Sequence, residues 1–130
     1  IGEESNKKLL EFINSNDSFL TNDIAKKYSE GIESNMDFYE LKSILTKMFE
    51  KVKKKHFNEC KEIIETTRAY NEASKKEAIK LLKDEIFEKN KWVEIPMKLV
   101  HKAVANINRN KPLDQESLDA DRLGGQPEND

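Results

Sequence analysis

The chain of 130 residues carries 23 basic and 25 acidic side chains, and charged residues make up 37% of it. This length fits one globular domain and excludes a large multidomain enzyme. A net charge of -2 gives no overall attraction to polyanions or anionic lipid, and the apolar runs are far shorter than the roughly 20 residues that span a bilayer.

The body of the chain has almost no residues that interrupt helices. Only four glycines and three prolines occur, and none of them lies between Gly31 and Pro96. Lys, Glu, Leu, Ile and Ala dominate that stretch, which gives it a high summed helix propensity, and alternating β-branched runs are absent. The sequence therefore predicts an all-α fold, a small bundle of four to five helices over residues 1–110 with one long central helix.

Two short helices are expected first. The first helix should start after Ser5 and end in the turn-forming residues 14–18. Thr21 is a good N-cap for the second helix, because its hydroxyl can accept a hydrogen bond from a backbone N–H of the first turn. Gly31 and the polar residues 33–35 should end this second helix.

The long central helix is predicted from about Met36, where apolar residues recur at steps of three and four. That spacing is typical of the heptad seam of a bundle or a coiled coil, which serves either as core or as an interface. The stripe continues to Tyr70 with a shifted phase because Lys55 and His56 occupy the next seam positions, so residues 36–70 fit one bent helix or two. The seam residues are Phe38, Leu41, Leu45, Met48 and Val52.

Two further helices should follow the central one. Residues Ser74 to Glu77 match a capping box, so a helix should begin there and end near Asn90. Its expected buried face consists of Ala78, Ile79, Leu82, Ile86 and Phe87. Trp92 falls in the next connector, either as part of the core or as an exposed anchor for a partner. Pro96 suits the first turn of the last helix, because its fixed backbone angle is already helical.

The last twenty residues differ from the body. Residues 111–130 carry six acidic and two basic side chains, a net charge of -4, with few large apolar groups and several turn formers. So little apolar surface cannot offset the entropy lost on ordering the chain. We therefore expect a disordered acidic tail.

No catalytic residues are predicted. The GxxxxGK[ST] and GxGxxG phosphate loops and the HExxH and GxSxG motifs are all absent from the sequence. His56 and Cys60 are four residues apart and share a helix face, but they lack the further ligands that a metal needs. We expect no enzymatic activity, no cofactor and no metal.

The subcellular location stays open. A single cysteine excludes an internal disulfide framework and fits both a cytoplasmic chain and a cysteine-poor secreted domain. The sequence begins with Ile1 rather than Met, so a signal or targeting segment could lie upstream of it. Lysine outnumbers arginine 20 to 3, a composition typical of AT-rich genomes.

Five lysines form the only dense basic cluster, which helix geometry spreads around most of the circumference. Such a cluster is either a solvated face or a contact for the phosphates of nucleic acid or lipid headgroups. Arg68 is the only arginine nearby, so base-specific readout is not expected. The cluster consists of Lys51, Lys53, Lys54, Lys55 and Lys61.

The first fifty residues resemble a helix-turn-helix layout. The residues that carry the resemblance are the apolar residues 9–13, a turn, residues 21–28 and a third amphipathic helix from Met36. A DNA-binding motif of this kind would place a basic recognition helix third, whereas residues 36–50 mix acidic residues with lysines. Three ordinary bundle helices remain the favoured interpretation.

The interpretation favoured by the sequence is a non-catalytic protein interaction module that self-associates or binds another protein through its long amphipathic helix. The expected partner-binding residues are Leu41, Leu45, Met48, Val52 and Trp92. The main alternative is a domain that binds nucleic acid or an anionic surface through the lysine cluster or the helix-turn-helix-like region. A third alternative is a lipid carrier whose bundle opens around an acyl chain.

The tail provides the first test. Truncation of the chain after Asn110 should leave the melting temperature nearly unchanged, because a tail with this composition contributes little to folding. Thermal unfolding followed by circular dichroism measures the effect. A drop of more than about 5 °C, on the order of 1 kcal/mol for a domain of this size, would show that the tail packs on the body.

Overall fold

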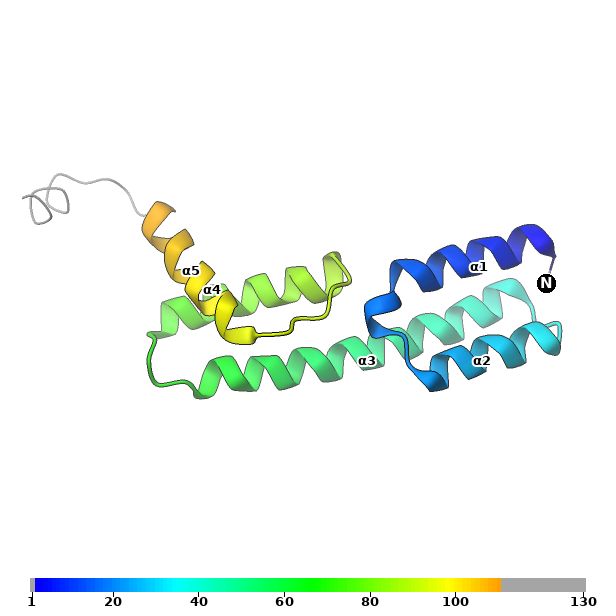
Figure 1. Cartoon of the computed structure of the whole chain (residues 1–130), viewed down its shortest axis with the longest axis horizontal. Helices are drawn as coiled ribbons and strands as arrows, with labels where there is room; N and C mark the ends of the chain where they lie inside the picture. The colour runs from blue at the N-terminus through cyan, green and yellow to red at the C-terminus, as the bar shows by residue number, and fades with distance from the viewer. Residues whose placement is uncertain (1, 111–130) are drawn as a thin grey trace, which may run out of the picture.

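The computed structural model describes residues 2–110, and these residues form five α-helices, one 3-10 turn and one π-helical turn, with no strand among them (Figure 1). The predicted all-α class is confirmed. The expected tail, 111–130, lies outside the described residues. The elements are α1 (Glu3–Ser15), η1 (Asp17–Phe19), α2 (Asn22–Glu33), α3 (Phe38–Thr66), α4 (Glu72–Lys83), η2 (Asp84–Glu88) and α5 (Pro96–Asn110).

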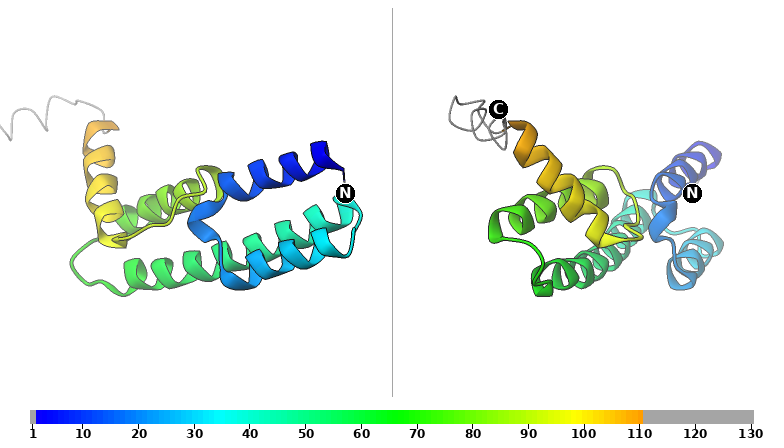
Figure 2. Two further views of the ribbon diagram at one scale, coloured as in Figure 1. Left: turned by 45° about the vertical axis from the view of Figure 1, so that its right-hand side comes forward. Right: turned by 60° about the vertical axis from the view of Figure 1, so that its left-hand side comes forward.

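The helices form two groups that share α3. The N-terminal unit consists of α1, η1, α2 and the first half of α3, and the C-terminal unit consists of the second half of α3 with α4, η2 and α5 (Figures 1 and 2). The two units lie end to end, so the described part of the chain is elongated along α3. The two units therefore meet at the middle of α3.

Helix α3 is a single helix of 29 residues, which settles the choice between one helix and two over residues 36–70. Its start is defined by Asp37, whose carboxylate accepts hydrogen bonds from the backbone N–H groups of Tyr39 and Glu40 at 3.1 and 3.2 Å. At 1.5 Å per residue the helix is about 43 Å long. It ends at Thr66, four residues before the expected limit at Tyr70.

The buried stripe of α3 differs from the expected seam. Leu41 and Leu45 are fully buried as expected, but Met48 and Val52 are only half-buried, and Phe49 is buried instead. The reason is that the covered face turns gradually around α3, since α1 and α2 cover one side of its first half and α4 and α5 cover another side of its second half. A constant heptad seam does not follow such a turn.

The caps of the shorter helices correct two expected boundaries. Helix α1 starts at Glu3 rather than after Ser5, with acidic residues in its first turn. Helix α4 starts at Glu72, because the Asn71 side chain accepts a hydrogen bond from the Ser74 backbone N–H at 2.8 Å. Ser74 therefore lies inside the helix, where it is buried.

Two expected helix starts are confirmed. The hydroxyl of Thr21 accepts a hydrogen bond from the backbone N–H of Ile24 at 3.2 Å and caps α2. Pro96 is the first residue of α5, where its missing N–H costs no hydrogen bond.

Gly31 has a different role from the one expected. It lies inside α2 and is buried, and the chain leaves the helix only after Glu33, with Asn35 at a positive φ of 56°. A Cβ at Gly31 would lie 2.6 Å from both Cδ atoms of Leu41, a residue with no exposed surface. The absent side chain therefore lets α2 approach α3 closely.

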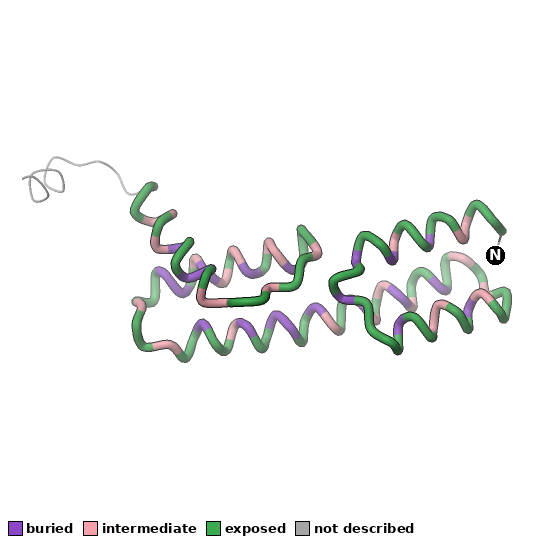
Figure 3. Tube along the Cα trace, in the orientation of Figure 1, coloured by how far each residue is buried: buried purple, intermediate pink, exposed green. Residues whose placement is uncertain are grey.

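The apolar core runs through both units and along α3 (Figure 3). In the C-terminal unit it includes the expected residues Ala78, Leu82 and Ile86, whereas Phe87 is 39% exposed. The fully buried large side chains are Phe19, Phe49, Leu9, Ile24, Leu41, Leu45, Ile64, Leu82, Ile86 and Val100. Because these residues come from both units, one continuous core holds the two together.

Truncation of Leu45 tests this core. Leu45→Ala should lower the free energy of unfolding by about 2–5 kcal/mol, because Leu45 has no exposed surface and its loss leaves a cavity. Lys54→Ala, an exposed change on the same helix, is the matched control and should alter stability by no more than about 0.5 kcal/mol. Urea denaturation measures both, and equal stabilities of the two variants would contradict the packing.

Candidate interaction surface at the junction of the two units

A buried lysine joins the two units at the middle of α3. The ammonium group of Lys53 donates hydrogen bonds to the Oδ1 atoms of Asn16, 2.7 Å away, and Asn90, 2.5 Å away. Asn16 follows α1 in the N-terminal unit, and Asn90 follows η2 in the C-terminal unit. Lys53 therefore joins α3 to two segments of the chain, one 37 residues before it and one 37 residues after it.

The environment of Lys53 is polar but uncharged at close range. Lys53 is only 8% exposed, and its ammonium lies 5.7 Å from the ring centre of Phe19, a cation–π contact. Burial lowers the pKa of Lys53, and the negative charge of Glu50 opposes this effect in part. None of the described carboxylates forms an ion pair with Lys53, so two amide oxygens and one aromatic ring replace its lost hydration.

His56 fixes the connector of residues 89–95 one turn further along α3. Its Nε2 atom accepts a hydrogen bond from the backbone N–H of Val93 at 3.0 Å, which requires this nitrogen to be unprotonated. Burial is the largest cause of a lowered pKa of His56, and the charges of Glu59 and Glu94 oppose it. The lowered pKa favours the neutral imidazole that the contact with Val93 requires.

Trp92 packs on the outer side of His56. The two rings are stacked with centres 3.6 Å apart and planes inclined by 19°, and Phe19 contacts Trp92 with ring centres 5.7 Å apart. Trp92 nevertheless keeps 48% of its surface exposed, and its indole N–H donates no hydrogen bond to any of the described residues. The result is a rigidly held aromatic ring with one apolar face and one free donor at the surface.

Further apolar side chains are exposed around this ring. Leu20, next to Phe19, is 42% exposed, and Ile95 in the same connector is 47% exposed. Ile63 is 48% exposed and lies about two helical turns beyond His56, so it is on the same side of α3 as His56. We call the set Leu20, Ile63, Trp92 and Ile95 the waist surface.

The structure separates the predicted partner-binding residues. Leu41 and Leu45 belong to the core and offer no surface, and Met48 and Val52 are half-buried and pack against that core. Of the five residues, Trp92 alone is exposed. Of the predicted set, only the connector residue Trp92 therefore offers a largely exposed apolar side chain to a partner.

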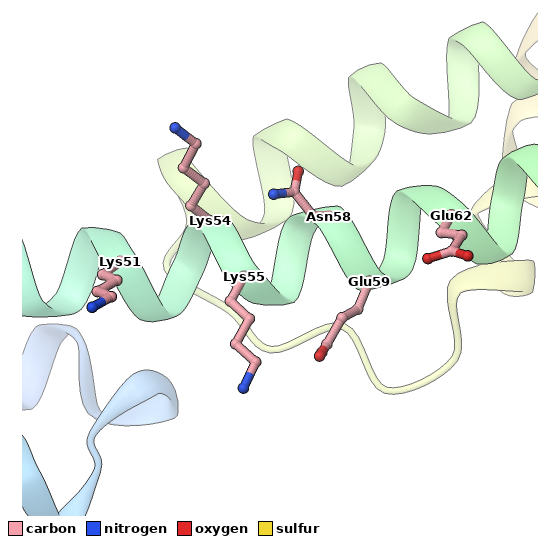
Figure 4. Close-up of a pocket in the computed structure, with 6 residues that line it drawn as sticks. All are labelled: Lys51, Lys54, Lys55, Asn58, Glu59 and Glu62. Carbon is pink, nitrogen blue, oxygen red and sulfur yellow. The ribbon is translucent and has the colours of Figure 1, made fainter.

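The lysine cluster is likewise divided. Lys53 is buried, and Lys61 lies 3.9 Å from the carboxylate of Glu65. Lys51, Lys54 and Lys55 line a shallow pocket with Asn58, Glu59 and Glu62, and Lys54 points away from the other two (Figure 4). The two carboxylates in the same pocket reduce its attraction for phosphate.

The helix-turn-helix-like region forms a different arrangement from the DNA-binding motif. Helix α2 lies alongside the first half of α3 in each view, rather than crossing it steeply (Figures 1 and 2). The side of α3 that faces α1 and α2 is occupied by core residues such as Phe49.

The described part of the chain contains neither a cluster of metal-binding side chains nor a helix that could span a membrane. No group of three His, Cys, Asp or Glu side chains is placed to hold a metal ion there. The Sγ of Cys60 lies 3.6 Å from the Nε2 of His56, and burial raises the pKa of this thiol. None of the described helices combines the length and the apolar character needed to cross a bilayer.

Comparisons with known proteins give no relative. The chain matches no protein-family model, no curated protein and no solved structure. Its interpretation therefore depends on its own geometry.

Protonation of His56 provides a test of the junction. A lowered folded-state pKa means that the folded chain binds fewer protons than the unfolded chain below about pH 6.5, so stability should fall as the pH drops from there. His56→Gln, which keeps a hydrogen-bond acceptor but does not titrate, should show a weaker loss. Urea denaturation at about pH 7.5 and 5.5 measures the difference.

The control for this test is His101→Gln, which removes the other histidine and leaves the contacts of His56 in place. The loss of stability at the lower pH should persist in this variant. If His56→Gln and the unaltered chain lose the same stability, His56 is not the group responsible.

Proposed function

We propose that this chain is a non-catalytic protein interaction module that docks a partner protein on the waist surface. The observation that carries the proposal is the half-exposed Trp92, held in one position by its stack on the buried His56. Tryptophan is enriched among the residues that dominate binding energy at protein interfaces. A ring already held in place loses little conformational freedom when a partner covers it, which favours binding.

The surroundings of Trp92 support the same function. Leu20, Ile63 and Ile95 add apolar surface, and charged residues such as Glu59 and Glu94 lie close enough to influence His56. An apolar centre with a polar rim is typical of protein interfaces. The free indole N–H can donate a hydrogen bond to a carbonyl of the partner.

A photo-reactive amino acid placed at position 92 tests this function. We expect it to form covalent adducts with a partner in an extract of the cells that produce the chain. The matched control replaces Tyr39, an aromatic residue that is 77% exposed and lies in the first turn of α3.

A competition experiment tests which surface the partner contacts. An excess of the unaltered chain should suppress the adducts, whereas an excess of Leu20→Ser/Ile95→Ser should suppress them less, since both side chains belong to the waist surface. Equal adduct formation from positions 39 and 92, or none from either, would reject the proposal.

A further inference from the structure

Helix α5 has a basic face with no acidic residue beside it on the same helix. It is the only one of the five described helices without an acidic residue, and it carries Lys98, Lys102 and Arg109. These residues follow one another at steps of four and seven, which places them within about 40° of one another around the helix axis. We call this set the α5 basic face.

The α5 basic face has no ion-pair partner among the described residues. Its three side chains are exposed, and none of them forms a salt bridge in the described part of the chain. The preceding segment differs, because Lys75, Lys80 and Lys89 lie 3.8, 3.9 and 3.0 Å from carboxylates. Helix α5 lies against α4, and its C-terminal end points away from the rest of the body (Figures 1 and 2).

The chain that follows α5 has the opposite charge. Residues 51–110 carry 15 basic and nine acidic side chains, an excess of six positive charges, and residues 111–130 carry an excess of four negative charges. Four of the acidic side chains fall within residues 114–121, which contain no basic residue. We call residues 114–121 the acidic segment, and it begins four residues after the end of α5.

The acidic segment is long enough to lie along the α5 basic face. From Lys98 to Arg109 the face extends over 11 residues, which is about 17 Å at 1.5 Å per residue. An extended chain covers about 3.3 Å per residue, so roughly six residues match this length. Pro112 disfavours a helical conformation of the residue before it, which allows the chain to turn back beside α5.

We propose that the acidic segment docks on the α5 basic face of the same molecule. Opposite charges attract, and a tether of a few residues gives the segment an effective concentration on the order of millimolar. A separate acidic protein has to compete with this tethered occupant. Docking does not depend on whether a partner binds the waist surface.

The contact is electrostatic and reversible. Ion pairs between exposed side chains stabilise a fold only slightly, so the segment can dock without a large effect of truncation on the melting temperature. Salt screens exposed charges, so docking weakens as the salt concentration rises. While it is docked, the segment covers positive charge that would otherwise attract the phosphates of nucleic acid or lipid.

Paramagnetic relaxation in the full chain tests the docking. A nitroxide on Ser117→Cys lies in the middle of the acidic segment, and the native Cys60 is buried and thereby protected from labelling. At about 0.05 M NaCl, the amide signals of residues 98–103 should lose roughly half of their intensity or more relative to the reduced label, and they should regain most of it at about 0.5 M.

Neutralisation of the α5 basic face tests whether it is the docking site. In the labelled chain, Lys98→Gln/Lys102→Gln/Arg109→Gln should remove most of the signal loss at low salt, because glutamine does not attract a carboxylate as a cation does. Circular dichroism checks that this variant is folded.

The matched control removes the same charge from the N-terminal unit. Lys8→Gln/Lys26→Gln/Lys47→Gln changes three exposed lysines that form no ion pair with a described residue, and it should keep the signal loss. The inference is overturned by a signal loss that is absent from the labelled chain, that salt does not change, or that is equal in the α5 variant.

A short single-stranded oligonucleotide serves as a probe of uncovered positive charge. Neutralisation of the acidic segment in the full chain should make the probe bind about fivefold more tightly or better than in a control of equal net charge, because the α5 basic face is then free. Fluorescence anisotropy at low salt measures both affinities. The segment variant is Asp114→Asn/Glu116→Gln/Asp119→Asn/Asp121→Asn.

The control variant neutralises four exposed acidic residues of the N-terminal unit. It separates the release of the α5 basic face from the general effect of a more positive chain. Equal affinities of the two variants for the oligonucleotide would mean that the segment leaves the face open, which also overturns the inference. The control carries the changes Glu4→Gln/Glu11→Gln/Glu30→Gln/Glu33→Gln.

Discussion

The arrangement of the two units depends on the hydrogen bonds from Lys53 to Asn16 and Asn90. A buried ammonium group without partners is strongly destabilising, so loss of either amide oxygen should destabilise the fold. Each amide belongs to a different unit, and this requirement sets the position of one unit relative to the other. Apolar contacts alone would tolerate small shifts along α3, whereas these short polar contacts do not.

The same junction explains why an aromatic ring stays at the surface. Asn90 adopts a positive φ of 55°, which turns the chain after η2 and directs the connector back along α3. The His56 contact with Val93 then holds the connector in place, and Trp92 is left with one face on the imidazole and the other in solvent. The exposed ring is thus a consequence of how the units are joined, which is why we place the interaction surface there.

Much of the fold could be predicted from the sequence, because helix formation depends on local signals. The scarcity of glycine and proline, the Thr21 cap and the position of Pro96 are local features, and each prediction from them is confirmed. The start of α4 was misplaced because Asn71 and Ser74 are both good caps, and the sequence alone does not show which side chain is free to act.

The candidate site could not be predicted in the same way. Lys53 appears in the sequence as one lysine among several, and its two partners lie 37 residues away on either side, in turns where asparagine is common for other reasons. The core residue Phe49 was missed because the expected seam was a constant heptad, whereas the buried face of α3 turns with the units that cover it. Only the tertiary arrangement contains this information.

Both units share α3, and this affects how the chain unfolds. Each unit contains about half of this helix, so neither unit has a complete core of its own, and loss of α1 and α2 would expose Leu41, Leu45 and Phe49 to water. The middle of α3 contacts segments of both units, and its backbone amides should exchange with solvent only when the whole molecule unfolds. The two ends of the elongated molecule can unfold locally and independently of each other, while the junction next to Trp92 should unfold last.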